Sequence, residues 1–412
     1  MINKNRRLFS RIGPGIVVAA TGIGAGDLIA ASVAGARYGT VILWAAVLGA
    51  VMKFAMNEGL ARWQLVTGTT MLEGWIHRLP NIVSGYFLFY LLIWSFVVAG
   101  ALIAACGLAA HALFPYIPVP AWGVAHSLAA AVLVIAGRYR LLEPLMKFFV
   151  ALMLAVILAC AVLVAPDWRE ITFNLLRPTV PQGSVVFILG VMGGVGGSVT
   201  MLSYGYWIRE KGWRGKESLS QSRVDLAIAY GLTGVFGIAV MIISAGVQPD
   251  VVIGNKMVLE VANYMGTIAG PVGKWCFLIG FWGAVFSSML GVWQGIPYLF
   301  TDFVQTRKAY IQGGTPVDVD TCSRLYRGYL AYLSIPPMVL LLFGKPVWLV
   351  VVYAVAGAFF MPFLAGLLLY MNSRKGWLNE YKNGWGTNTL LTLSLLVFVG
   401  LFVIELLTRI QQ

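Results

Sequence analysis

Long apolar stretches separated by short polar segments repeat along the whole chain. A helix needs about 20 predominantly apolar residues to cross the hydrocarbon core of a bilayer. By that criterion the pattern predicts eleven transmembrane helices within one domain over residues 1–412. They cover Ile12–Tyr38, Val41–Gln64, Val83–Leu113, Val119–Ala136, Phe148–Ala165, Val185–Trp207, Leu226–Val247, Trp275–Phe300, Gly328–Phe343, Val347–Tyr370 and Leu390–Leu407. The chain is therefore predicted to be an all-α polytopic membrane protein.

Two of these stretches contain glycine clusters in mid-span. The first reads Gly-Ile-Gly-Ala-Gly-Asp over residues 22–27, and the sixth reads Gly-Gly-Val-Gly-Gly-Ser over residues 193–198. Glycine costs a helix roughly 1 kcal/mol relative to alanine, so the clusters predict unwound backbone. Unwound backbone at membrane depth survives only where it is buried or lines a cavity. The alternative interpretation is close helix packing through small residues.

The two clusters lie five spans apart, and this spacing predicts an architecture. Matching interruptions in corresponding helices of two halves are typical of the binding site of a secondary transporter. An odd offset of five gives the halves opposite topology. We therefore expect a LeuT-like 5+5 inverted repeat with discontinuous helices 1 and 6. Residues 12–165 form the first repeat, 185–370 the second, and 390–407 an additional eleventh helix.

Composition and charge agree with a membrane protein. Hydrophobic residues make up 59% of the chain and charged residues 11%, against about 25% charged in soluble domains. Most of the net charge of +13 lies in short polar segments, which argues for lipid headgroups and against a nucleic-acid partner. The basic segments are the amino terminus, 138–147, 209–223, 307–327 and 374–382. Because positive segments stay inside, we expect a cytoplasmic amino terminus and an extracytoplasmic carboxyl terminus in the inner, or plasma, membrane.

Charged residues inside the spans are the candidates for function. Asp27 ends the first glycine cluster, and an acid at mid-bilayer costs at least about 2.5–3.5 kcal/mol unless a partner or cation balances it. The alternative to a bound cation is a salt bridge to Lys53 of the second span. Glu58 stands four residues before Arg62, the spacing of a structural ion pair within one helix.

Several short motifs, in order and spacing, resemble the Nramp family of divalent-metal transporters along nearly the whole chain. They are Gly13-Pro14-Gly15, Gly35 and Gly39 before Leu43-Trp44, Leu60-Ala61-Arg62, Val66-Thr67-Gly68, Arg140-Leu141-Leu142-Glu143, Asp225 at the start of span seven, Ser287-Ser288 and Pro362-Phe363. The resemblance implies the eleven-helix inverted-repeat fold.

The predicted site departs from the family pattern. The family's Asp-Pro-Gly-Asn motif aligns with residues 24–27, so the acid moves from the first position to Asp27. The methionine of the family's Met-Pro-His run aligns with Thr200. The span-three acids associated with proton passage align with Ala101 and Ala104, and the span-ten glutamine with Ala354. By this resemblance Asp27 is the charged ligand that carries over.

The remodelled site favours an all-oxygen cation site. Carboxylate, hydroxyl and carbonyl oxygens suit hard cations such as Mg²⁺ or Mn²⁺, whereas the missing thioether suits softer metals. The candidate substrate-binding residues are Gly24, Gly26, Asp27, Gly197, Ser198, Thr200 and Met201. The candidate gating or structural residues are Lys53, Glu58 and Asp225.

We therefore predict alternating-access transport of a divalent cation without proton coupling, similar to the Nramp-related magnesium transporters. The metal is the substrate, no cofactor is needed, and a single chain suffices. Two alternatives stay open. The pocket could bind a small organic cation or amino-acid-like solute beside Trp94, Tyr204 or Phe360, or the protein could be a membrane sensor without transport. No phosphate loop, nucleophile–base pair or metal-ligand histidine set supports an enzyme.

Overall fold

The computed structural model describes residues 13–164, 166–194, 197–247, 257–314 and 318–410, and these form helices joined by short connections. The side chains of residues 25–27, 137–142, 257–258 and 408–410 lie outside the described part. Nine segments of the described chain are long and apolar enough to cross a membrane. The predicted all-α polytopic fold is thus confirmed in its class.

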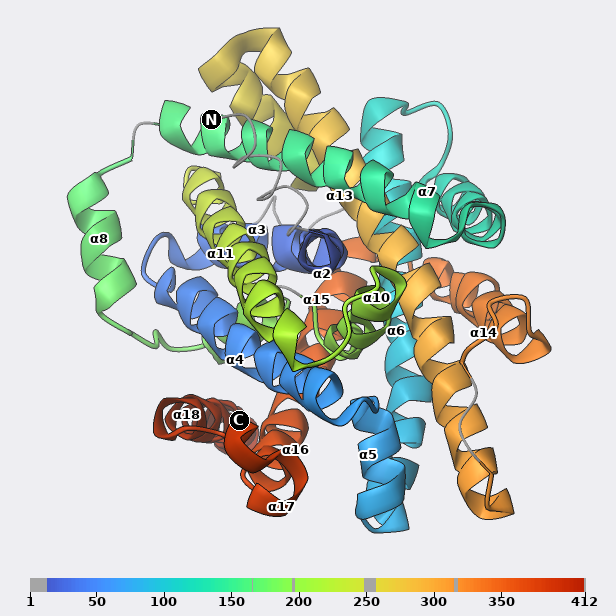
Figure 1. Ribbon diagram of the computed structural model, residues 1–412. Helices are drawn as coiled ribbons and strands as arrows, with labels where there is room; N and C mark the ends of the chain where they lie inside the picture. Colours follow the sequence, from blue (N-terminus) through green and yellow to red (C-terminus); the bar gives the residue numbers. More distant parts are fainter. Residues whose placement is uncertain (1–12, 165, 195–196, 248–256, 315–317, 411–412) are drawn as a thin grey trace, which may run out of the picture.

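The helices follow one another in the order shown in Figure 1. They are α2 (Pro14–Gly22), α3 (Ala25–Tyr38), α4 (Trp44–Thr67), α5 (Met71–Arg78), α6 (Asn81–Leu113), α7 (Val119–Leu163), α8 (Trp168–Leu176), α9 (Val185–Gly194), η1 (Val199–Ser203), α10 (Tyr204–Glu210), η2 (Lys216–Ser218), α11 (Leu219–Ser244), α13 (Met257–Gln312), α14 (Arg324–Ser334), η3 (Pro336–Phe343), α15 (Pro346–Ala358), α16 (Phe360–Asn372), α17 (Lys375–Leu378), η4 (Asn379–Tyr381) and α18 (Trp385–Ile410).

The first two predicted spans are not among the nine segments, for physical reasons. The first is divided into α2 and α3, of 9 and 14 residues, and neither piece is long enough to cross a bilayer alone. The second, α4, has 24 residues but includes Lys53, Glu58 and Arg62. Burial against neighbouring helices, rather than contact with lipid, allows α4 to carry these charges, since all three side chains are buried.

Two predicted polar connections are more helical than expected. The segment 138–147 lies inside α7, which runs through both the fourth and the fifth predicted span. The segment 301–327, expected as a loop, is helical up to Gln312 because α13 continues past the eighth span. Within α13, Gly270 has non-helical backbone (φ 66°, ψ −170°), which separates the apolar span from the helix before it.

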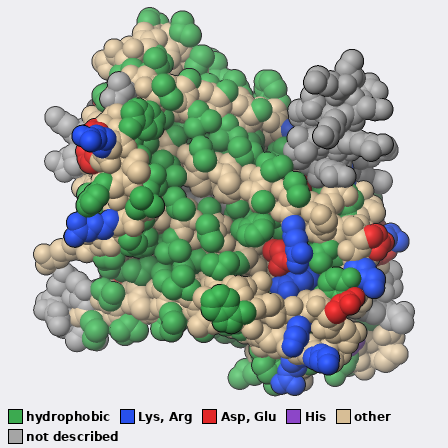
Figure 2. All heavy atoms as spheres, turned by 60° about the vertical axis from the view of Figure 1, so that its left-hand side comes forward, with side chains coloured by type: hydrophobic (Ala, Val, Ile, Leu, Met, Phe, Trp, Pro, Cys, Tyr) green, Lys and Arg blue, Asp and Glu red, His purple; other side chains and the backbone are tan. Residues whose placement is uncertain are grey.

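The divided first span lies at the centre of the bundle. α2 packs against α7, α10, α11 and α13, and α3 packs against α9, α11 and α15 (Figure 1). α16 and α18 pack against each other and against α4. Figure 2 shows a face covered broadly by hydrophobic side chains, with most of its Lys, Arg, Asp and Glu side chains toward the borders. That distribution matches a surface in contact with lipid, because charged side chains avoid the hydrocarbon region.

Candidate functional site at two broken helices

The first span is interrupted between Gly22 and Ala25. Ile23 (φ −67°, ψ 74°) and Gly24 (φ −149°, ψ −146°) leave the helical conformation. A Cβ at Gly24 would collide with the Cβ of Ser288. The backbone at the break can therefore lie this close to α13 only because residue 24 has no side chain. The Ser288 hydroxyl donates to the carbonyl of Thr21 at 2.7 Å and satisfies a carbonyl in the last turn of α2. The unwinding predicted for this glycine cluster is confirmed.

The sixth span is interrupted in the same manner. α9 ends at Gly194, Gly197 has φ 77°, and the 3₁₀ helix η1 leads into α10. A non-glycine residue would be strained at this φ, and its Cβ would also meet the Thr200 hydroxyl. The glycine at position 197 is therefore required by both backbone conformation and space. Residues 195 and 196 lie outside the described residues.

The two interruptions lie next to each other. α2 contacts η1 and α10, α3 contacts α9, and α13 contacts both α2 and η1. Ser198 and Thr200 are 2% and 5% exposed, and Met201 is fully buried. The Ser198 Oγ has no hydrogen-bond partner among the described residues. A buried hydroxyl without a partner costs free energy unless a ligand or water satisfies it, so it marks a place for a polar ligand.

Lys53 lies against the second interruption. Its fully buried ammonium donates to the carbonyl of Gly193 at 2.8 Å and also to the carbonyl of Gly197. The alternative interpretation, a salt bridge between Lys53 and Asp27, stays untested. Asp27 lies in the first turn of α3, and its side chain falls outside the described part.

Glu58 and Asp225 occupy structural positions. The predicted pair is present, with 3.1 Å between Glu58 Oε2 and Arg62, and Arg223 adds a second contact to Glu58 at 2.9 Å. Asp225 of α11 accepts hydrogen bonds from the backbone N–H groups of Gly13, at 3.0 Å, and Gly15, at 2.6 Å. A carboxylate on the free N–H groups at a helix start is stabilised by hydrogen bonding and by the helix dipole.

Ser288 and Asn57 were not identified as site residues from the sequence. Ser288 belongs to the serine pair of the family resemblance, which was the available signal for it. Asn57 stands one turn after Lys53 on α4. Its Nδ2 donates to Tyr230 at 3.0 Å, while its buried Oδ1 has no partner among the described residues. An asparagine at helical spacing from a lysine was the only sequence signal for it.

Contacts between α4, α5, η1, α10 and α13 close the bundle on one side of the interruptions. Gln64 Nε2 donates to the carbonyl of Gly205 at 2.6 Å, and the cavity between these elements is only about 10 Å³. The Asp302 carboxylate accepts from Thr70 at 3.1 Å and from Tyr206 at 2.8 Å. A cavity of this size holds at most about one water molecule, so the elements around it are closely packed in this conformation.

Beyond this closure lies a more polar cavity of about 260 Å³, lined in part by Gln64, Arg209 and Asp318. Arg209 lies 3.5 Å from Glu73 of α5. Burial raises the pKa of Glu73, and the opposing effect of Arg209 is smaller. The ion pair therefore adds to the closure between α5 and α10.

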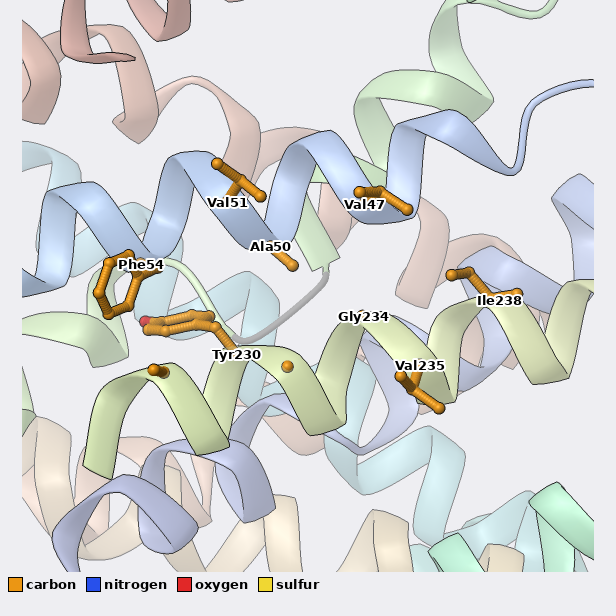
Figure 3. A pocket seen from close by; sticks show the side chains of 10 residues that line it. Val47, Ala50, Val51, Phe54, Tyr230, Gly234, Val235 and Ile238 are labelled. Atoms are coloured by element: carbon orange, nitrogen blue, oxygen red, sulfur yellow. The ribbon is translucent and has the colours of Figure 1, made fainter. Parts of the chain in front are cut away.

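A different cavity, of about 300 Å³, lies between α4 and α11 (Figure 3). Its lining is apolar, and Val47, Val51 and Val235 are partly exposed at its rim. The Tyr230 ring lies between Phe54 and Gly234 in this view. A lining of this kind suits lipid chains, and its lining residues do not include those of the candidate site.

The chemistry available at the interruptions is that of oxygen ligands. Among the described side chains, no group of three or more His, Cys, Asp or Glu residues could hold a metal ion. The hydroxyls of Ser198 and Thr200 are the described polar side-chain groups at the second interruption that could contact a cation, together with backbone carbonyls. Of the aromatic residues considered for an organic solute, Tyr204 donates to Asp225 at 3.0 Å, and Phe360 stacks on Tyr90.

Comparison with known proteins agrees with this geometry. Residues 15–408 match the family described as "Natural resistance-associated macrophage protein-like". The divalent metal cation transporter MntH of Burkholderia ambifaria is 22% identical over 69% of this chain and 66% of its own length. An uncharacterized protein of Pasteurella multocida is 23% identical over 65% of this chain and 63% of its own length. The chain thus spans just under two thirds of the length of both.

Solved structures share the fold. The manganese transporter of Eremococcus coleocola, in complex with an aromatic bis-isothiourea substituted compound, superposes with a TM-score of 0.72 at 17% identity, covering 97% of this chain and 86% of that one. MhsT in complex with L-phenylalanine superposes with a TM-score of 0.59 at 17% identity, covering 94% and 97%. At these identities both likenesses show the fold alone.

Proposed function

We propose, from the premise that this chain belongs to the Nramp family of membrane transporters, that it moves a divalent metal cation across the membrane by alternating access. The family consists of transporters and not of enzymes, and its members carry metal as substrate and need no cofactor. The observation that carries the proposal is the pair of adjacent interruptions in the first and sixth spans, where the buried Ser198 hydroxyl has no partner among the described residues.

The donor set supports a hard cation, with Mg²⁺ or Mn²⁺ preferred. Asp27 is proposed to supply the carboxylate, and Ser198 and Thr200 the hydroxyls, with backbone oxygens near Gly24 and Gly26 completing the site. Hydroxyl and carboxylate oxygens match Mg²⁺ and Mn²⁺ better than softer metals. With one carboxylate, Mg²⁺ would keep several of its waters. Met201 is proposed to contribute through its backbone, because its side chain is buried in the apolar core.

Transport is proposed to proceed without proton coupling. Ala101 and Ala104 are buried in α6, at the positions where the resembling family has acids associated with proton passage. Alanine cannot exchange a proton, so these positions offer no relay. The metal is then proposed to move down its own gradient, without a proton that passes along this part of α6.

The architecture proposed for the whole chain is the eleven-helix 5+5 inverted repeat, with residues 12–165 and 185–370 as the repeats and 390–407 as the eleventh helix. The alternation of basic segments supports a cytoplasmic amino terminus and an extracytoplasmic carboxyl terminus. A single chain is proposed to be sufficient, because both interrupted helices belong to the same chain.

Uptake into proteoliposomes tests the proposal. Purified protein is assayed with Mg²⁺, Mn²⁺, Ca²⁺ and Fe²⁺ and an internal pH dye, with Asp27→Ala beside wild type and the exposed Asp318→Ala as control. We expect Mg²⁺ or Mn²⁺ influx without acidification, lost in Asp27→Ala and kept in Asp318→Ala. Influx unchanged in Asp27→Ala would refute the site, acidification would refute uncoupled transport, and absence of any metal influx would refute the cation proposal.

A small organic cation or amino-acid-like solute is the second candidate, and one observation favours it. Trp94 of α6 is 2% exposed, and its indole N–H has no partner among the described residues. A buried indole can bind a cationic solute through its face and an acceptor through its N–H. Uptake of a labelled amine or amino acid in the absence of metal influx would support this candidate.

A further inference from the structure

Lys53 is a fully buried lysine whose ammonium lies on the interrupted sixth span. Its Nζ donates to the carbonyls of Gly193 and Gly197, which lie before and after the break. Gly193 belongs to the last turn of α9, where carbonyls lack helical N–H partners and carry the negative end of the helix dipole. The lysine therefore supplies a positive charge where the interrupted backbone presents oxygen atoms.

The surroundings of this ammonium are closely packed. A Cβ at Gly193 would approach the carbonyl of Ala354 to 2.5 Å, and a Cβ at Gly49, one turn before Lys53, would lie 3.1 Å from Met192 Cα. α4, α9 and α15 thus meet through small residues, which leaves little room for bulk water. In such a place carbonyl dipoles are the groups that replace the hydration of a charge.

Carbonyl oxygens at the ends of broken half-helices are also the groups that coordinate a coupling cation in transporters of this architecture. We propose that Lys53 is a tethered substitute for such a cation. Its ammonium occupies the carbonyls of Gly193 and Gly197 permanently, so that the protein needs no dissociable monovalent cation at the sixth span. This role rests on the proposed transport function, but its effect on stability can be measured without any substrate.

Two further polar atoms lie close in sequence to the residues of this contact. The Ser198 Oγ follows Gly197 directly, and the Asn57 Oδ1 lies one helical turn after Lys53. Both are buried without a partner among the described residues. The two carbonyls that the ammonium occupies are oxygen atoms of the kind that coordinate Na⁺ or K⁺ in place of water, so a small cation can take their place as partner once the ammonium is removed.

Thermal unfolding in detergent tests the inference first. Lys53→Met keeps an unbranched side chain that is one atom shorter, and it removes the charge and the hydrogen-bond donors. Purified variants are compared in NaCl, KCl, LiCl and the bulky salt N-methyl-D-glucamine chloride at equal ionic strength. We expect a lowered melting temperature for Lys53→Met that rises with Na⁺, K⁺ or Li⁺. Wild type and the control Lys147→Met, whose lysine pairs with Glu143 at 2.7 Å, should be indifferent to the cation.

Uptake in proteoliposomes is the second measurement. Lys53→Met should lose at least about ten-fold in uptake rate in the bulky salt and recover with the same cation that stabilises it. A folded Lys53→Met that is fully active without added cation, or that no monovalent cation stabilises, would overturn the inference. If Lys53→Met does not fold, the melting temperature of the wild-type protein in the same salts is the test. Selective stabilisation of the wild type by Na⁺ or K⁺ would show that it binds a dissociable cation and would overturn the inference. Equal melting temperatures in all salts would support the inference. Absence of metal uptake by wild type would refute the proposed function while leaving the stability test valid.

Discussion

The Asp225 carboxylate connects its own helix, α11, to α2 and α10 through hydrogen bonds. It binds the two glycine N–H groups at the start of α2 and accepts the hydroxyl of Tyr204, from α10, at 3.0 Å. A Cβ at Gly15 would approach the Asp225 carboxylate closer than a van der Waals contact allows. Asp225 therefore positions the first half of the divided helix relative to α10 and α11.

We predict that Asp225→Asn destabilises the protein by about 1.5–3 kcal/mol, because hydrogen bonds to a buried charged group contribute this much. The amide can accept at one atom only, and its NH₂ group would face a backbone N–H. Thermal unfolding in detergent should show a lower melting temperature. Asp318→Asn is the control, since that side chain is 92% exposed and its ion pair with Arg209 is long, at 3.9 Å. Equal melting temperatures for the two variants would contradict the prediction.

The interrupted helices depend on contacts with intact ones. α2 ends at Gly22 because a glycine-rich segment follows it, and because the Ser288 hydroxyl of α13 donates a hydrogen bond to the Thr21 carbonyl. α9 ends at Gly194, and Lys53 of α4 satisfies the carbonyl of Gly193. In both cases a side chain from another helix compensates the backbone that the interruption exposes, which is the condition for unwound backbone inside a membrane.

We predict that Gly24→Ala lowers both melting temperature and uptake, since the new methyl group overlaps Ser288 and overpacking costs about 1–3 kcal/mol. Gly24→Ala combined with Ser288→Gly should recover part of the loss, because the double variant removes the opposing Cβ. Gly231→Ala serves as the control, as nothing lies within 4 Å of its added Cβ. Additive effects of Gly24→Ala and Ser288→Gly would show that the two positions are not in steric contact.

At the scale of the whole molecule, polar contacts join the helices on the side of α5 and α10. The Gln64–Gly205 hydrogen bond and the carboxylates of Glu73 and Asp302 link α4, α5, α10 and α13 on that side. Alternating access would require these contacts to break while the interrupted helices move. In the proposed topology this side, which is next to the basic segment 209–223, faces the cytoplasm.

We predict that Cys322, exposed between α13 and α14, faces the cytoplasm. In a protein where Cys106, Cys160 and Cys276 are replaced by Ser, a membrane-impermeant maleimide should label Cys322 only after the membrane is permeabilised. A cysteine added after Gln412, with Cys322→Ser, should be labelled in intact cells. The protein with all four replacements and no added cysteine is the blank. Labelling of Cys322 in intact cells would reverse the proposed topology.

The positions of most helices could be predicted from the sequence, because lipid imposes a simple rule of about 20 apolar residues per span. The two interruptions could also be predicted, because each glycine in a helix costs free energy relative to alanine, and several glycines together favour unwound backbone. The Glu58–Arg62 pair followed from spacing on one helix in the same way. The order of short motifs further predicted the family that the match over residues 15–408 establishes.

Only the tertiary structure decided which groups meet at the interruptions. Lys53 donates to the carbonyls of Gly193 and Gly197, about 140 residues away in sequence, and its pairing with Asp27 stays a prediction. The contacts of Ser288 with Thr21, and of Asp225 with the start of α2, likewise join distant segments. Hydropathy and local propensity act over one helix, whereas the packing of several helices determines where a long buried side chain finds its hydrogen-bond partners.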